Sequence, residues 1–171
     1  MSYTEEHLAR MNRSGQRAGA VGSRPTLVTQ ALQSLEREGI VRKDAKVLDF
    51  GAGKRAAQTA ILRNEGWKDV TPYDIGTNGN GEELEDFAIY DVVLMSNVLN
   101  VQPTIEKLRE VLYQVWRNTR HRGILICNLP REPRYGPYEA GQMSQWIEWE
   151  GFQITRTHRS GAGVVWICEA V

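Results

Sequence analysis

The 171-residue sequence has few cysteines and histidines, no long apolar run and no excess charge of either sign. Two cysteines and three histidines occur, and twenty-one basic residues balance twenty-one acidic ones. Cys127 and Cys168 lie in apolar runs at a spacing that matches no metal pattern, so we predict buried free thiols. Balanced charge excludes a globally basic surface for nucleic acid or membranes. No stretch approaches the roughly 18 apolar residues of a membrane span, and no signal peptide is evident. We therefore predict a cytoplasmic protein without a metal or membrane partner.

The composition is that of a soluble globular protein. Hydrophobic residues make up 41% and charged residues 25% of the chain, close to the globular average. Residues 1–24 are polar, and Arg10, Arg13, Arg17 and Arg24 outnumber the acidic residues there. We predict an N-terminal arm at 1–24, whose arginines could contact nucleic acid, and one domain at 25–171.

The order of apolar segments predicts a three-layer α/β sandwich. We expect a first helix capped by Ser23 and ending at Gly39, then a helix at 54–64 that buries Ala56, Ala57, Ala60 and Ile61. Further helices are predicted from 103 and at 138–149, and strands at 46–50, 69–73, 91–95, 123–129, 153–158 and 164–170. The sheet should be mostly parallel, with an antiparallel last strand.

The segment between Asp74 and Asp91 is too short and too polar for a full strand and helix. An abbreviated third-strand region is therefore expected. It would leave the strand at 69–73 on the edge of the sheet, where Pro72 is tolerated because it cannot donate to a neighbouring strand.

The most informative motif is the glycine turn in VLDFGAGKRAA, residues 47–57. Gly51, Gly53 and Ala56 formally match the dinucleotide fingerprint, with Asp74 about twenty residues further on. Asp49, however, would oppose a pyrophosphate at this turn. S-adenosylmethionine carries an ammonium and a sulfonium and no phosphate, so Asp49 could attract its amino group. The glycines allow close backbone approach, and Asp74 could accept hydrogen bonds from the ribose hydroxyls.

Four segments in order, VLDFGAGKR, VTPYDIG, YDVVLMSNVLN and GILICNL, resemble the motif series of class I S-adenosylmethionine-dependent methyltransferases. The resemblance covers about residues 25–171 and implies a Rossmann-like methyltransferase sandwich with S-adenosylmethionine as cofactor. GSRP at 22–25 and SNVLNV at 96–101 further resemble small methyltransferase-like proteins of phages and of DNA-modification loci.

The family resemblance implies roles for individual residues. Asp49, Gly51 and Gly53 would bind the methionine end of the cofactor, and Asp74 would bind the ribose. Ser96 and Asn97 would lie where cofactor and substrate meet. Asn97 and Asn100 are the candidate catalytic residues, because either amide could orient the methyl acceptor. The resemblance implies methyl transfer to an unidentified small molecule or nucleic acid.

The sequence also departs from the family pattern. Arg55 replaces the third glycine and could either pair with the cofactor carboxylate or point outward, and Glu85 and Asp86 are candidates for the adenine-binding acid. The chain lacks the Asn/Asp-Pro-Pro-aromatic motif that holds a flipped base, so amino methylation of adenine or cytosine is not supported. Cys127 lies in an apolar run, which argues against a cysteine nucleophile.

Two alternatives to a methyltransferase remain open. A non-catalytic S-adenosylmethionine-binding sensor or subunit is favoured by Arg55 and the shortened middle segment. An NAD(P)-dependent reductase is favoured by the fingerprint alone and opposed by Asp49.

Three other segments have predicted roles. The basic cluster at 117–123 fits a helix C-terminus, where the dipole favours cations. The loop at 131–138 suits either a substrate-facing loop with stacking tyrosines or a plain connector. Trp146 and Trp149 are expected to pack in the core and at interfaces.

Overall fold

The computed structural model describes residues 4–6, 9, 24–74, 84, 89–131 and 138–171. Predictions for the arm arginines Arg10, Arg13 and Arg17, for Glu85 and Asp86, and for residues 132–137 lie outside the described residues. The division into an arm and a domain stays a prediction.

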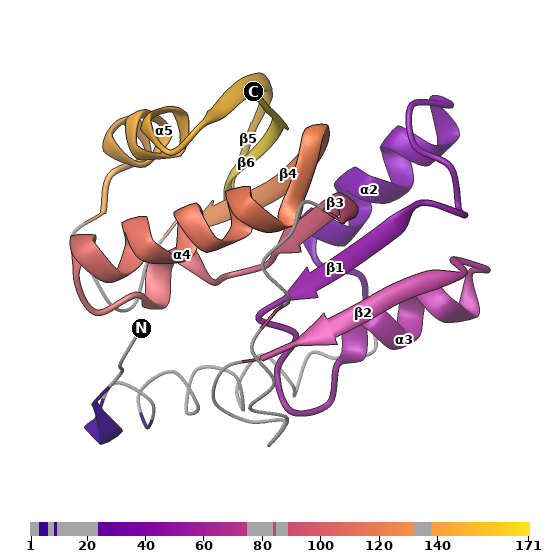
Figure 1. The fold of residues 1–171 in the computed structure, drawn as a ribbon, viewed down its shortest axis with the longest axis horizontal. Coiled ribbons are helices and arrows are strands. Elements are labelled where there is room, and N and C mark those ends of the chain that lie inside the picture. The colour runs from indigo at the N-terminus through magenta and orange to yellow at the C-terminus, as the bar shows by residue number, and fades with distance from the viewer. Residues whose placement is uncertain (1–3, 7–8, 10–23, 75–83, 85–88, 132–137) are drawn as a thin grey trace.

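The described residues form one mixed sheet with helices on both faces (Figure 1). Its six strands lie in the order β2-β1-β3-β4-β6-β5. The main elements in chain order are α2 Leu27–Arg37, β1 Lys46–Phe50, α3 Ala57–Asn64, β2 Asp69–Tyr73, β3 Tyr90–Met95, the short 3-10 helix η1 Leu99–Val101, α4 Ile105–Asn118, β4 Thr119–Pro130, α5 Ala140–Trp149, β5 Phe152–Ser160 and β6 Gly163–Ala170. This confirms the predicted α/β sandwich.

Strand direction follows the prediction. β1 pairs in parallel with β2 and β3, and β3 pairs in parallel with β4. β6 runs antiparallel between β4 and β5, so the predicted antiparallel last strand is confirmed. β2 lies at the edge of the sheet, with Pro72 opposite Asp49 of β1. The parallel strands β1, β2 and β3 thus end at the same edge of the sheet, at Phe50, Tyr73 and Met95.

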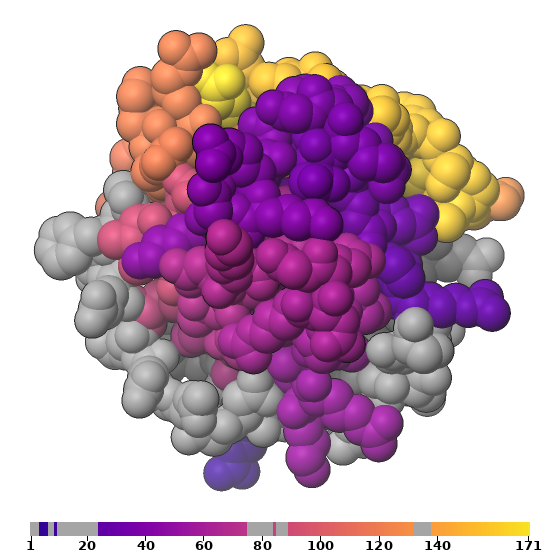
Figure 2. All heavy atoms as spheres, turned by 90° about the vertical axis from the view of Figure 1, so that its right-hand side faces the viewer, coloured from indigo at the N-terminus to yellow at the C-terminus, as the bar shows by residue number. Residues whose placement is uncertain are grey.

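Alternation along the strands divides the core into two layers. Leu48 and Phe50 belong to the layer beneath α4 and α5, whereas Val47 belongs to the layer that contains residues of α2 and α3. Figure 2, which faces the right-hand side of Figure 1, shows the N-terminal half of the chain covering this second face. Because side chains alternate along a strand, Asp49 shares the face of Val47 and is directed toward α3.

Two helices begin later than the sequence predicted. α2 follows Thr26, whose hydroxyl accepts a hydrogen bond from the Thr29 N–H at 3.3 Å, so Thr26 rather than Ser23 is the N-cap. α3 begins at Ala57 because Ala56 adopts a left-handed conformation with φ of 44°. The buried residues of α3 are Thr59 and Leu62.

The predicted inward face of the second helix was therefore wrong. Ala60 is exposed, and Ala56, Ala57 and Ile61 are only partly buried. Thr59 faces the sheet instead and contacts Asp49. The hydrophobic pattern did not predict this, because threonine is polar. The other two helices also start slightly later than predicted, at Ile105 and Ala140.

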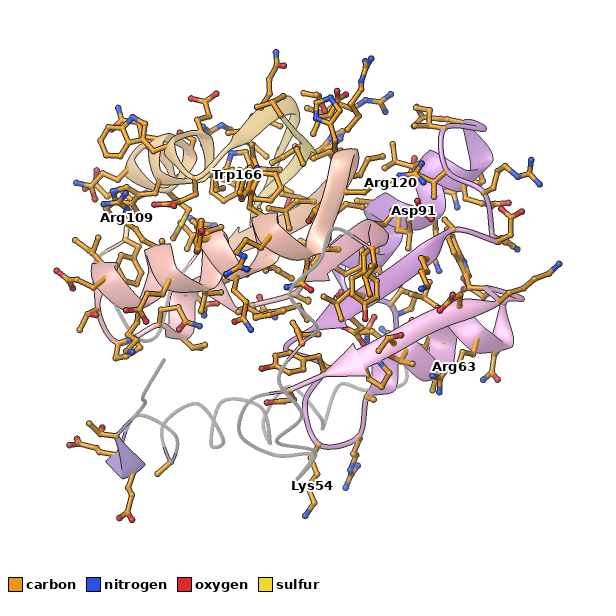
Figure 3. The ribbon with its side chains drawn as sticks, viewed as in Figure 1. Lys54, Arg63, Asp91, Arg109, Arg120 and Trp166 are labelled. Carbon is orange, nitrogen blue, oxygen red and sulfur yellow. The ribbon has the colours of Figure 1, made fainter. Side chains whose placement is uncertain are left out.

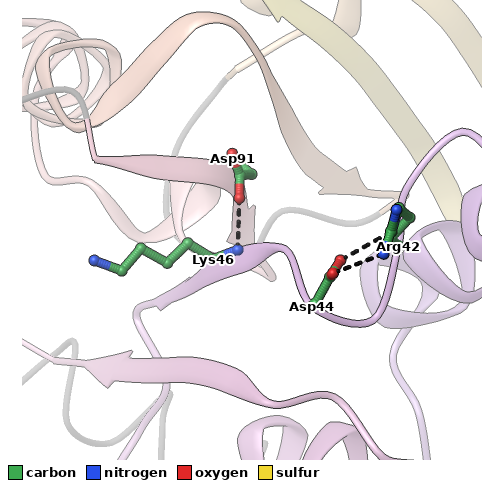
Figure 4. Close-up of polar contacts among 4 residues, drawn as sticks. All are labelled: Arg42, Asp44, Lys46 and Asp91. Carbon is green, nitrogen blue, oxygen red and sulfur yellow. Dashed lines mark hydrogen bonds and ion pairs between the residues drawn. The ribbon is translucent and has the colours of Figure 1, made fainter.

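The basic cluster is a strand feature rather than a helix end. β4 begins at Thr119, and only Arg117 lies in the last turn of α4. Arg120 Nη1 pairs with Asp91 Oδ1 at 2.6 Å, and Asp91 Oδ2 accepts a hydrogen bond from the Lys46 N–H at 2.7 Å (Figures 3 and 4). Arg122 Nε pairs with Glu169 at 3.0 Å. These ion pairs brace the end of the sheet opposite the glycine turn.

The cysteine prediction is confirmed, because Cys127 and Cys168 are both free and buried. A hydrogen bond with the Cys127 thiol, together with burial, raises the pKa of Cys168. Of the two tryptophans on α5, Trp146 is buried as predicted, whereas Trp149 is 67% exposed and does not pack in the core.

Candidate functional site

The glycine turn follows β1 directly and is held by its neighbours. Gly51 and Gly53 have φ of +79° and +72°, values that favour glycine. The N–H groups of Gly51 and Ala52 both donate to the Tyr73 carbonyl, at 2.7 and 3.0 Å. A Cβ on Gly51 would collide with Val98, whereas a Cβ on Gly53 would meet no atom of the described residues within 4 Å. The turn is therefore anchored at Gly51, and no described residue fills the space beside Gly53.

Asp49 lies beneath this turn and is 3% exposed. Its Oδ2 accepts a hydrogen bond from the Thr59 hydroxyl at 2.7 Å. Burial raises the pKa of Asp49 to about 6, because desolvation disfavours the charged form; the Thr59 hydroxyl and N–H oppose the shift, and the negative charge of Asp74 adds to it. The carboxyl group is thus held at an energetic cost that a nearby cation would relieve.

Asp74 immediately follows β2 and is half-buried. Asp49 lies opposite Pro72 on the neighbouring strand, two positions before Asp74, and the negative charge of Asp74 contributes to the raised pKa of Asp49. The sequence placed both on the same sheet edge, and the structure brings them together there.

Ser96, Asn97 and Asn100 follow β3 at the same edge. Ser96 Oγ and Asn100 Oδ1 are buried and have no hydrogen-bond partner among the described residues. Buried polar atoms are nearly always hydrogen-bonded in folded proteins, so an unpaired atom at a candidate site is consistent with a partner supplied by a ligand. Asn97 is exposed and has a left-handed φ of 56°.

Asn128, on β4, is a site residue that the sequence did not reveal. Its side-chain amide makes two hydrogen bonds with Asn97, one to the backbone N–H and one to the side-chain oxygen. The only available signal was a polar residue in the otherwise apolar run ILICNL.

Gln102, which follows η1, is held in place by Tyr138, which lies just before α5. The Tyr138 hydroxyl donates to the Gln102 carbonyl at 2.8 Å, and Gln102 Nε2 donates to the Val98 carbonyl at 2.9 Å. The Tyr138 ring meets Trp146 edge-on with centroids 5.9 Å apart. Burial raises the pKa of Tyr138, which favours its protonated, donating form. Tyr138 is therefore a buried support, so of the two alternatives for the loop at 131–138 the stacking role does not hold for this residue.

Other groups near the turn do not converge on it. Lys54 points away from the domain (Figure 3), and Arg55 is exposed. No group of three or more His, Cys, Asp or Glu side chains in the described parts of the chain is arranged to hold a metal ion. None of the described helices has both the length and the apolar character of a membrane span.

The fold is that of the S-adenosylmethionine-dependent methyltransferases. The 1,6-didemethyltoxoflavin-N1-methyltransferase of Burkholderia thailandensis, solved with bound 1,6-didemethyltoxoflavin and S-adenosylhomocysteine, is 17% identical; the match covers 100% of this chain and 92% of that one, with a TM-score of 0.74. The magnesium protoporphyrin IX methyltransferase of Synechocystis PCC 6803, solved with S-adenosylmethionine, is 17% identical over 100% and 87% of the chains, with a TM-score of 0.63.

A third structure with this fold is a TehB-like S-adenosylmethionine-dependent methyltransferase of Corynebacterium glutamicum ATCC 13032 Kitasato. It is 13% identical over 95% and 98% of the two chains, with a TM-score of 0.58. No family model and no curated protein matches the sequence.

Proposed function

We propose that this protein binds S-adenosylmethionine at the carboxyl ends of β1, β2 and β3 and transfers its methyl group to an acceptor. The observation that carries this proposal is the buried Asp49 carboxyl beneath the glycine turn, with a raised pKa and a second carboxylate, Asp74, nearby. This environment favours a cationic ligand group and opposes a phosphate. The three solved methyltransferases with the same fold support the choice of cofactor.

The described residues fit the groups of this cofactor. Asp49 would attract the ammonium group, and its low-dielectric surroundings would strengthen that attraction. The space beside Gly53 would admit the methionine chain close to the backbone. Asp74 would accept hydrogen bonds from the ribose hydroxyls. When bound, the cofactor would supply an activated methyl group on sulfur.

The residues of this chain would contribute mainly position. Methyl transfer from a sulfonium needs little acid-base chemistry, so orientation of the acceptor can supply much of the rate. Asn97 and Asn100, directly after β3, would orient the acceptor through their amides. This role explains why the described site contains amides and a hydroxyl beside the glycine turn rather than an acid-base pair.

The acceptor is a small molecule or a nucleic acid, and the two remain alternatives within the proposal. The arginines of residues 1–24 favour nucleic acid, as does the further resemblance to phage-type and DNA-modification proteins. The free buried thiols are consistent with a cytoplasmic location.

A second candidate function is binding of S-adenosylmethionine without transfer, as a sensor or subunit. It is favoured by Arg55, which stands at the third-glycine position and is exposed. The NAD(P)-dependent reductase is disfavoured, because a pyrophosphate over Gly51 would face the negative charge of Asp49.

Calorimetric titration of the full chain with S-adenosylmethionine, S-adenosylhomocysteine and NADH tests the proposed cofactor. We expect binding of the first two and none of NADH. Tight NADH binding with no response to the sulfur nucleotides would contradict the proposal. Incubation with labelled S-adenosylmethionine and pools of DNA, RNA or metabolites then tests methyl transfer. If the protein binds the cofactor but labels none of the pools, the non-catalytic sensor or subunit is the favoured function.

The affinity for S-adenosylmethionine should depend on pH through Asp49. The free protein holds this carboxyl with a pKa of about 6, and a bound ammonium would lower that pKa. Below about pH 6, binding must therefore release a proton, and affinity should fall by up to about tenfold per pH unit. Above that pH the affinity should level off. Calorimetry from mildly acidic to neutral pH measures this, and an affinity that rises on acidification would contradict the role of Asp49.

A further inference from the structure

A reciprocal pair of asparagines joins the ends of β3 and β4. The Asn97 N–H donates to Asn128 Oδ1 at 2.7 Å, and Asn128 Nδ2 donates to Asn97 Oδ1 at 2.8 Å. Asn128 is buried, with 6% exposure, whereas Asn97 is exposed. The two hydrogen bonds close a ring that fixes the backbone of Asn97 and the direction of its side chain together.

The donor and acceptor directions in this ring follow from one backbone group. A backbone N–H can only donate, so the Asn128 atom that faces it must be the oxygen. The other Asn128 atom is then the NH2 group, which also only donates, so the Asn97 atom that faces it must be its oxygen. The assignment of both amides is thus determined by the network. Asn97 Nδ2 is turned away from Asn128 with its two N–H donors.

Asn97 is surrounded by residues of the candidate site. Ser96 precedes it, and Val98, which follows it, contacts the position of a Cβ on Gly51 in the glycine turn. Ser96 Oγ and Asn100 Oδ1 are buried without a partner among the described residues. Asn97, an exposed residue, therefore lies at a sheet edge where two buried polar atoms have no partner among the described residues.

We propose that Asn128 is a positioning residue that turns the Asn97 amide so that its NH2 group faces the methyl acceptor. The acceptor then carries a lone pair, on a carbonyl oxygen or an unprotonated ring nitrogen, beside the atom that is methylated. This inference rests on the proposed function for the identity of the site. The orientation itself rests on the hydrogen bonds alone.

Two bicyclic probes of similar size test the polarity of this position. Isoquinoline offers a ring-nitrogen lone pair, and indole offers an N–H donor instead. Isotope-labelled full-length protein, saturated with S-adenosylhomocysteine at mildly alkaline pH, is titrated with each while the Asn97 side-chain NH2 signals are followed by NMR. We expect isoquinoline to shift these signals with about tenfold tighter apparent binding than indole. Equal or tighter binding of indole, or no response to isoquinoline, overturns the inference.

Asn128→Asp tests the positioning role with a nearly isosteric change. The carboxylate still accepts from the Asn97 N–H, but its second oxygen also accepts, so the Asn97 amide should turn and present its oxygen outward. The preference should then reverse in favour of indole. A variant that keeps the wild-type preference overturns the role of Asn128.

Asn97→Gly is the matched control. Glycine tolerates the positive φ of Asn97, and its N–H can still donate to Asn128, so the variant removes only the amide. We expect near-equal binding of the two probes, now followed on the Asn128 side-chain signals. A retained tenfold preference would assign the recognition to another residue and overturn the inference.

Calorimetry with S-adenosylhomocysteine on the same samples separates this inference from the proposed function. If that ligand fails to bind and the probes still discriminate as expected in its absence, the proposed function fails and the orientation by Asn128 stands. If it binds and the Asn97 signals do not respond to isoquinoline, only the inference fails.

Discussion

Replacement of Asp49 by asparagine should make the free protein more stable and its complex with S-adenosylmethionine weaker. The raised pKa of Asp49, about 6 against 3.8 for an ordinary aspartate, corresponds to a net cost of roughly 3 kcal/mol for the charged carboxylate at neutral pH, in which the Thr59 hydrogen bonds already offset part of the desolvation. The asparagine would carry no charge and could still accept from the Thr59 hydroxyl. We expect Asp49→Asn to raise the free energy of unfolding by about 1–3 kcal/mol and to lower affinity about 10- to 100-fold.

The pH dependence of unfolding gives a second readout of Asp49→Asn. Because the pKa of Asp49 is higher in the folded state, its contribution to stability is fully present below about pH 4 and is lost as the pH rises through about 6. The free energy of unfolding of Asp49→Asn should not show this decrease with rising pH. Urea unfolding of the free proteins across this range measures it. If Asp49→Asn were less stable than the wild type at neutral pH, the conclusion that the buried Asp49 charge destabilises the free protein would be contradicted.

Asp91→Asn is the matched control, because it makes the same chemical change at the opposite end of the sheet. Asp91 is paired with Arg120 and accepts from the Lys46 N–H, so its loss should destabilise the fold by about 1 kcal/mol. Affinity for S-adenosylmethionine should be unchanged. Equal losses of affinity in both variants would indicate a general effect on folding rather than a role of Asp49 at the site.

Gly51→Ala should be strongly destabilising, whereas Gly53→Ala should act mainly on ligand binding. Both positions have positive φ, which costs alanine about 1 kcal/mol, but only a Cβ at Gly51 collides with Val98. We expect a loss of about 2–4 kcal/mol for Gly51→Ala and about 1 kcal/mol for Gly53→Ala. The methyl group at position 53 would occupy the space proposed for the cofactor. In Gly53→Ala, the loss of binding free energy for S-adenosylmethionine should therefore exceed the loss in free energy of unfolding.

Val98→Ala should partly rescue Gly51→Ala. Removing the two Val98 methyl groups relieves the collision, so the double variant should be more stable than the sum of the single effects by about 1 kcal/mol. Denaturant unfolding of the four proteins measures this coupling. Additive effects would show that the backbone conformation of Gly51, rather than its contact with Val98, requires glycine.

The sheet could be predicted because its strands are continuous apolar runs. The runs at 46–50, 69–73 and 91–95 match β1, β2 and β3 to within one residue. Helix starts were less predictable. Nothing in the sequence marks Ala56 as left-handed, and that single conformation delays α3 and brings Thr59 to the sheet.

The candidate site was predictable where one segment determines it and not where two segments meet. The turn after β1 places Asp49, Gly51 and Gly53 from local sequence alone. The hydrogen bonds of Asp49 with Thr59 and of Asn97 with Asn128 join residues 10 and 31 positions apart. Such partners depend on how helices and strands pack, which no local pattern contains.

The position of Pro72 has a consequence for association between molecules. Among the described residues, no strand pairs with the outer side of β2. An open strand edge is a template for unwanted sheet extension, and natural proteins often block it with proline. Pro72 offers an incoming strand one backbone donor fewer, so this edge should resist aggregation.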